Sequence, residues 1–235
     1  MGKGLLADGG AKVLLAEHWL EVADPKHRYG EARCSVVFVL VLDSNRPSFA
    51  GSLLTRYHDV WKVSEVPENF FYWLDYGAGR DVELPECSRH NLDTSVVKYL
   101  GPEERLKYLV TIREGLLWYH DTDDLVHTDD VDGEHSRTNG SGKREKWIYI
   151  VDPKGAFFVA KKVRGRFHHS SFLSGGPAKA AGNLTIQQGR LVRLSPSSGH
   201  YQPTPDDHAW FLELLRLRGV DLSGVILEDF KGKWR

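Results

Sequence analysis

Residues 161–203 read KKVRGRFHHSSFLSGGPAKAAGNLTIQQGRLVRLSPSSGHYQP, and we interpret the rest of the chain as organised around them. This segment gathers cationic, small, hydroxyl and imidazole side chains more densely than any other part of the sequence. Its glycines let the backbone approach a ligand closely, and their amide groups can donate to an anion. We therefore place the candidate site in this segment.

The site residues that we predict fall into two groups. The candidates for catalysis are His168, His169, Ser170, Ser171, His200 and Tyr201. The candidates for ligand binding are Lys161, Lys162, Gly175, Gly176, Ser198 and Gly199. We expect residues 168–171 to lie in a strand, so that alternate side chains point to opposite faces and only one histidine faces a common cleft.

Size and composition bound the class of protein. A chain of 235 residues is long enough for one good-sized domain or two small ones. With 41% hydrophobic and 27% charged residues, the composition is that of a soluble globular protein. The net charge of −1 provides no electrostatic case for nucleic acid or an anionic membrane as a partner.

The sequence predicts no metal site. Cys34 and Cys87 form no CxxC motif. The histidines of the central segment, His168, His169 and His200, lack the spacing of zinc ligands.

Hydrophobic periodicity predicts a single α+β domain over residues 1–235, with a mixed or antiparallel sheet and flanking helices. Thr204, followed by Pro205 and two aspartates, is typical of a helix N-terminus. The polar run 121–146 predicts a flexible surface loop. Helices are predicted at 11–23, 86–100 and 204–218, and strands at 34–42, 69–76, 108–112, 116–120, 147–152, 157–163, 184–186 and 190–194.

Eight stretches resemble a known family. In order they are AKVLLAEHWLEVADPKHRYG (11–30), YHDVW (57–61), FFYWLDYG (70–77), KYLGPEER (98–105), KWIYIV (146–151), KGAFFVAKKVRGRFHHSSFLSGGPAKAAGNL (154–184), GRLVRLSPSSGHYQPT (189–204) and GVDLS (219–223). In these stretches the chain resembles the C-terminal domain of the plant IQ-motif-containing (IQM) calmodulin-binding proteins and their fungal relatives. The resemblance implies calcium/calmodulin-linked signalling and stress responses, in the cytoplasm or nucleus.

The chain departs from the family in two places. The family's calmodulin-binding IQ motif lies upstream, and we expect this chain to start after it. Ile186-Gln187 looks like the opening of the motif, but Leu191 and Val192 stand where its Arg-Gly should be. We therefore regard calmodulin as a doubtful partner and leave another protein partner open. About 26 residues (31–56) also intervene where family members run on directly, and we interpret them as an insertion.

Three functions compete for the central segment. The leading one is a ligand- or protein-binding regulatory module without a cofactor. The alternative is an NAD-using transferase or hydrolase, because the segment weakly resembles the NAD-binding strand of ADP-ribosyltransferase toxins, with Glu213 and Glu228 as nominal catalytic carboxylates. The third is a buried hydrogen-bond network with a structural role. An enzyme would need the imidazoles and hydroxyls to line one open pocket, with a carboxylate in reach.

Overall fold

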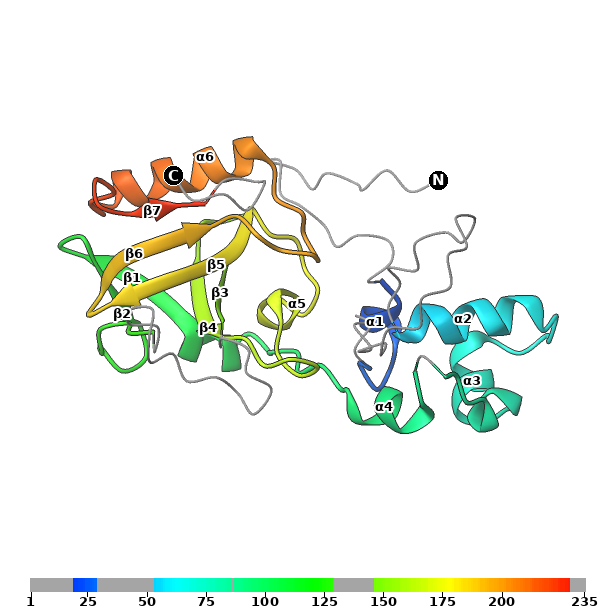
Figure 1. The fold of residues 1–235 in the computed structure, drawn as a ribbon. Helices are drawn as coiled ribbons and strands as arrows, with labels where there is room; N and C mark the ends of the chain where they lie inside the picture. The colour runs from blue at the N-terminus through cyan, green and yellow to red at the C-terminus, as the bar shows by residue number, and fades with distance from the viewer. Residues whose placement is uncertain (1–18, 29–52, 86, 129–145, 229–235) are drawn as a thin grey trace. The chain divides into compact units, whose positions relative to one another are not determined.

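The computed structural model describes residues 19–28, 53–85, 87–128 and 146–228 (Figure 1). They belong to two compact units, one of residues 16–98 and one that holds the described residues from Tyr99 onward. The prediction of one domain over residues 1–235 stays a prediction. The helix expected at 11–18, the strand expected at 34–42, most of the predicted insertion and the last part of the polar loop lie outside the described residues. No helix in the described ranges is long and apolar enough to cross a bilayer.

The described residues of the unit 16–98 form short helices. These are α1 (Trp19–Ala23), α2 (Leu53–Val63), α3 (Phe70–Asp75), the 3-10 turn η2 (Ala78–Asp81) and α4 (Arg89–Thr94). The strand predicted at 69–76 is wrong, because these residues form α3. The Asn69 side chain caps this helix by accepting a hydrogen bond from Tyr72 N at 3.0 Å, and the buried residues Phe70, Trp73 and Leu74 follow helical spacing.

A buried arginine ties this unit together. Arg28 is fully buried, and its guanidinium donates to Asp24 Oδ2 at 2.7 Å and to Asp75 Oδ1 at 2.8 Å. Burial alone would lower the pKa of Arg28, but the hydrogen bonds to Asp24 and Asp75 outweigh it and raise that pKa. Arg28 follows α1, and these ion pairs explain why the segment after this helix carries an arginine.

The second unit is built on a seven-stranded sheet. Its strands are β1 (Leu109–Arg113), β2 (Leu116–Tyr119), β3 (Trp147–Val151), β4 (Phe157–Lys161), β5 (Ala180–Gln187), β6 (Arg190–Ser195) and β7 (Ile226–Leu227). The order is β2-β1-β4-β3-β5-β6-β7, and every pairing is antiparallel except β6 with β7. The flanking elements are η3 (Glu104–Tyr108), α5 (His169–Phe172) and α6 (Pro205–Leu217). The predicted α+β class with a mixed sheet is confirmed (Figure 1).

The sheet curls, so that its β2 edge meets the turn between β5 and β6. Leu117 N donates to Gly189 O at 2.8 Å, and Gly189 N donates to Val126 O at 2.9 Å. Gly189 has a φ of +74°, a backbone conformation that favours glycine. Within the predicted polar loop, residues 121–124 are exposed, whereas Val126 and Thr128 are buried and Thr128 exchanges hydrogen bonds with Ile186.

Helix α6 covers one side of the sheet (Figure 1). It begins as predicted, because Thr204 Oγ1 accepts from Asp207 N and the Asp207 carboxylate accepts from Thr204 N at 2.7 Å. Phe211 of this helix stacks on Tyr149 of β3, with ring centroids 4.9 Å apart, and meets Phe157 of β4. These rings form the centre of the buried core of this unit.

We expect Gly182→Ala to destabilise the protein, because a Cβ at this position would collide with the backbone carbonyl of Ser195 on β6. Forced overpacking costs about 1–3 kcal/mol. Gly199→Ala is the matched control, since a Cβ there meets nothing within 4 Å. Urea unfolding of both variants measures the difference. Equal unfolding midpoints for the two variants would contradict the close strand approach at Gly182.

Candidate functional site

Residues 168–171 do not form the strand that the sequence predicts. They form the start and body of α5, a single helical turn in which His168 is the N-cap. His168 N donates to Ser171 Oγ at 2.9 Å, and Ser171 N donates to His168 O at 3.1 Å. Serine hydroxyls compete for backbone groups in this way, and this favours a capped turn over strand pairing. All four side chains are buried, so the predicted division between two faces of a strand does not apply.

His169 is a buried donor. Its Nε2 lies 2.9 Å from the carbonyl oxygen of Gly182 on β5, and because a carbonyl oxygen only accepts, His169 carries its proton on Nε2. Burial lowers the pKa of His169 to about 3, against the opposing effect of the Gly182 hydrogen bond. The imidazole is therefore neutral at pH 7, and its proton is directed at the backbone.

The residues predicted at 198–201 close a corner beside α5. Tyr201 donates from its hydroxyl to Gly176 O at 2.8 Å, and Tyr201 N donates to Ser198 Oγ at 3.4 Å. The rings of His168 and His200 stack with centroids 5.8 Å apart. The structure thus brings the predicted catalytic candidates together, but as a buried cluster in which His169 and Tyr201 hydrogen-bond to backbone carbonyl oxygens. Their predicted role in catalysis stays a prediction.

The predicted ligand-binding residues do not lie together in one site. Gly175 and Gly176 close α5, since Gly175 N donates to Ser170 O at 2.9 Å and Gly176 N to Leu173 O at 2.8 Å. Gly199 is exposed on the turn before Tyr201. Lys162 lies just beyond β4, where its N–H donates to Lys146 O. Lys161, at the end of β4, lines a pocket.

That pocket, which we call the Tyr119 pocket, has a volume of about 330 Å³. Its walls come from η3, β2, β3, β4 and the turn that follows β4. Burial raises the pKa of Tyr119 to about 12, so this phenol is protonated at neutral pH. The residues that line the pocket are Lys107, Tyr108, Tyr119, Trp147, Ala160, Lys161, Val163 and Phe167.

Helix α5 supports one wall of the Tyr119 pocket. Phe172 of this helix packs edge to face on Phe167, with centroids 5.1 Å apart, and Phe167 packs on Tyr108 at 5.4 Å. The residue before Phe172 holds the chain that leads into η3, because Leu100 N donates to Ser171 O at 2.9 Å. The buried histidine and serine cluster therefore positions two aromatic side chains of the pocket.

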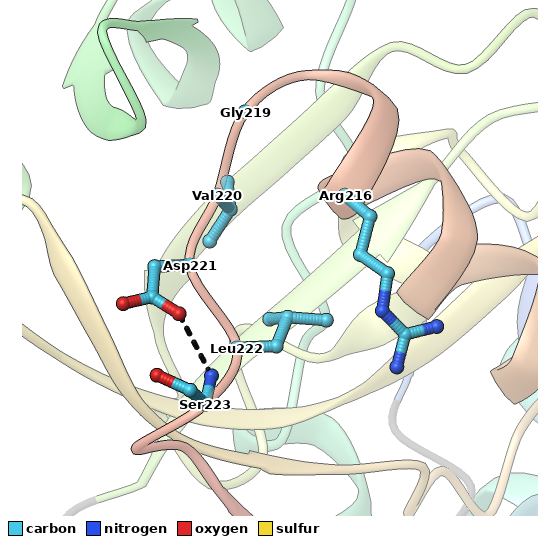
Figure 2. Close-up of a pocket in the computed structure, with 6 residues that line it drawn as sticks. All are labelled: Arg216, Gly219, Val220, Asp221, Leu222 and Ser223. Atoms are coloured by element: carbon cyan, nitrogen blue, oxygen red, sulfur yellow. Dashed lines mark hydrogen bonds between the residues drawn. The ribbon is translucent and has the colours of Figure 1, made fainter.

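A second pocket, of about 500 Å³, lies in the loop that follows α6 and is lined by Arg216 and residues 219–223 (Figure 2). Asp221 Oδ1 accepts from Ser223 N at 2.9 Å, and backbone and side-chain hydrogen bonds from Ser223 lower the pKa of Asp221. Arg216 points away from that carboxylate in Figure 2 and lies 3.6 Å from Glu213. The charged groups of this loop thus interact with neighbouring residues, and no predicted site residue lines the pocket.

Sequence comparison assigns the chain to a family. Residues 104–208, which include η3, β1 to β6 and α5, match the model of the IQ motif-containing protein middle domain. The chain belongs to the IQM family. The predicted resemblance is confirmed, but the matched domain is the middle domain of the family and not the C-terminal domain predicted from the sequence. No solved structure matches this IQM chain.

Curated relatives of this IQM chain come from Arabidopsis thaliana. It is 38% identical over 226 residues to the IQ domain-containing protein IQM2, across 96% of the chain and 32% of the relative. It is 38% identical over 225 residues to IQM5, across 96% of the chain and 39% of the relative, and 36% identical over 225 residues to IQM3, across 96% and 42%. The chain thus spans about a third to two fifths of the length of these relatives.

Stability should fall as pH drops below the usual pKa of histidine, because His169 stays neutral in the folded state down to about pH 3 while the unfolded chain takes up a proton near pH 6.5. One such proton contributes at most about 1.4 kcal/mol per pH unit. Urea unfolding at pH 7, 6 and 5 measures the slope.

His169→Gln is the control for this pH dependence, because the glutamine amide can donate to Gly182 O and does not titrate. Carboxylates titrate equally in both proteins, so the difference in slope reports His169. If stability depends equally on pH in the parent and in His169→Gln, His169 is not buried in its neutral form.

Proposed function

We propose that this chain is a ligand-binding regulatory module without catalytic activity, and that the Tyr119 pocket is its binding site. The observation that carries this proposal is the composition of the pocket, which combines four aromatic walls with two lysines. Small-molecule sites are concave and largely apolar, with a few polar groups that orient the ligand. The imidazoles and hydroxyls that an enzyme would need are buried around α5 and line neither of the two pockets described above.

The regulatory part of the proposal rests on the family. The relatives are IQ domain-containing proteins, and we propose that this domain couples ligand binding to calcium/calmodulin-linked signalling and stress responses in the cytoplasm or nucleus. Calmodulin binds its targets as amphipathic helices. Ile186-Gln187, the IQ-like dipeptide, lies at the end of β5, where Ile186 is fully buried. The burial of Ile186 in a strand argues against calmodulin binding at this dipeptide.

We also propose that the domain does not use NAD. The two nominal catalytic carboxylates lie on different elements. Glu213 is on α6, 3.6 Å from Arg216. Glu228 follows β7, where its N–H donates to Leu194 O. His169 already donates to Gly182 O. These contacts support a structural role for the residues that the transferase hypothesis would need.

NAD in excess should leave the thermal midpoint unchanged, because ligand that does not bind the folded state cannot stabilise it. His200→Ala should lower the midpoint, since this variant removes a buried ring stacked on His168. Buried truncations cost about 1–3 kcal/mol, and each kcal/mol shifts the midpoint of a protein of this size by about 2–4 °C. A midpoint that rises with NAD in the parent and not in His200→Ala would instead support the transferase.

A neutral aromatic probe tests the binding site itself. Benzyl alcohol should shift the NMR signals of Tyr119, Trp147 and Phe167, because its ring fits between theirs. Ala160→Leu should weaken this binding, since Ala160 lines the pocket and a larger side chain would fill it.

Two controls make the probe decisive. The unfolding midpoint of Ala160→Leu shows whether this variant is folded. If it does not fold, Val163→Phe replaces it, because Val163 lines the pocket from a half-exposed position. The proposed site is wrong if benzyl alcohol shifts no signal of the pocket, or if both filled variants bind it as the parent does.

A further inference from the structure

We propose that the ligand of the Tyr119 pocket is a small aromatic anion, a planar ring that carries a carboxylate or phosphate group. This inference rests on the proposed function, because it names the class of ligand for the same pocket. It goes further in one respect: it assigns the pocket a preference for negative charge. Two independent features of the pocket carry it, namely the charge of its lining and the chemistry of its walls.

The lining of the pocket is cationic. Lys107 and Lys161 line it, and no carboxylate from the part of the chain that the structure describes does. The two lysines come from η3 and from the end of β4, which are separate elements of the fold. Lys107 is exposed and Lys161 is half-buried, so both charges lie at a concave, partly apolar site and attract an anionic ligand there.

The surroundings of the pocket extend this positive charge. Residues 161–166 carry four cations and no acidic residue, although the whole chain has a net charge of −1. The turn from Val163 to Phe167 is closed by Phe167 N donating to Val163 O at 2.7 Å. Both ends of this turn line the pocket, so Arg164 and Arg166 lie on a loop that borders it. Glu104, an acidic residue on η3, does not line the pocket, and its carboxylate accepts from Gly101 N at 3.1 Å.

The walls of the pocket favour a ring. Tyr108, Tyr119, Trp147 and Phe167 line it, and aromatic side chains pack well against planar ligands in offset or edge-to-face geometry. Tyr119 is protonated at neutral pH, so its hydroxyl adds no negative charge to the site. A volume of about 330 Å³ is at the lower end of ligand pockets. A molecule with one or two rings therefore matches the pocket in size.

The test compares four probes with one ring each by NMR titration of the pocket signals: benzoate, phenyl phosphate, benzyl alcohol and benzylammonium. Benzoate should bind about tenfold more tightly than benzyl alcohol, the typical effect of charge-assisted hydrogen bonds. Added salt should reduce this preference. Benzylammonium should bind more weakly than benzyl alcohol. The ranking of benzoate and phenyl phosphate identifies the preferred anionic group, and either order supports the proposal.

Charge variants at one position separate electrostatics from shape. Val163 lines the pocket and is 46% exposed, so it tolerates polar substitution. Val163→Glu should remove the preference for benzoate over benzyl alcohol, whereas Val163→Gln should keep it. The double variant Lys107→Gln/Lys161→Gln should also remove the preference. Lys154→Gln should not, since Lys154 lies in the turn at the opposite end of the β3–β4 hairpin.

The outcomes distinguish this inference from the proposed function. If benzyl alcohol binds at the pocket as tightly as benzoate does, the inference is overturned and the proposed function stands. The inference also fails if Val163→Glu and Val163→Gln show the same preference. If none of the four probes shifts a pocket signal, both the inference and the proposed function are wrong.

Discussion

The hydrogen bond from His169 Nε2 to Gly182 O joins α5 to the centre of the sheet, and the candidate site depends on it. Gly182 lies on β5, between β3 and β6, where any Cβ would collide with the Ser195 carbonyl. Burial keeps the imidazole neutral, so this contact requires no buried charge. The polar segment 161–203 therefore has first of all a structural role, because its buried histidine holds α5 in place on the sheet. A one-turn helix has little stability of its own, and buried donors and acceptors fix its position.

The anchored helix determines the shape of the pocket beside it. Phe172 supports Phe167, and Phe167 packs on Tyr108, so aromatic packing transmits the position of α5 to the pocket wall. Leu100 is hydrogen-bonded to α5 as well, which holds the approach to η3 and Lys107. The two proposals about binding thus share one structural cause: a rigid support keeps aromatic and cationic side chains in place before a ligand arrives, and this reduces the entropic cost of binding.

Local patterns predicted the elements that depend on local signals. The strands β1 to β6 follow from β-branched and aromatic runs bounded by turns, except that β5 begins at Ala180 and was predicted only over 184–186; α6 follows from the cap at Thr204. The errors at 69–76 and 168–171 have one cause, because in each a side-chain cap, from Asn69 or Ser171, outweighed the pattern. Lys161 was predicted in the site and the other pocket residues were not. Their segments, from 107 to 167, meet only through the pairing of distant strands, which no local spacing reports.

The central claim is that His169 is a neutral, buried donor that anchors α5. Long-range ¹H–¹⁵N NMR of the histidine rings tests it most directly, since it reports which nitrogen carries the proton and at what pH the ring becomes charged. We expect a proton on Nε2 of His169, protected from exchange with water and unchanged from pH 7 to pH 5. A ring that titrates near pH 6.5 with freely exchanging protons would contradict it, and would return His169 to the list of accessible, reactive groups.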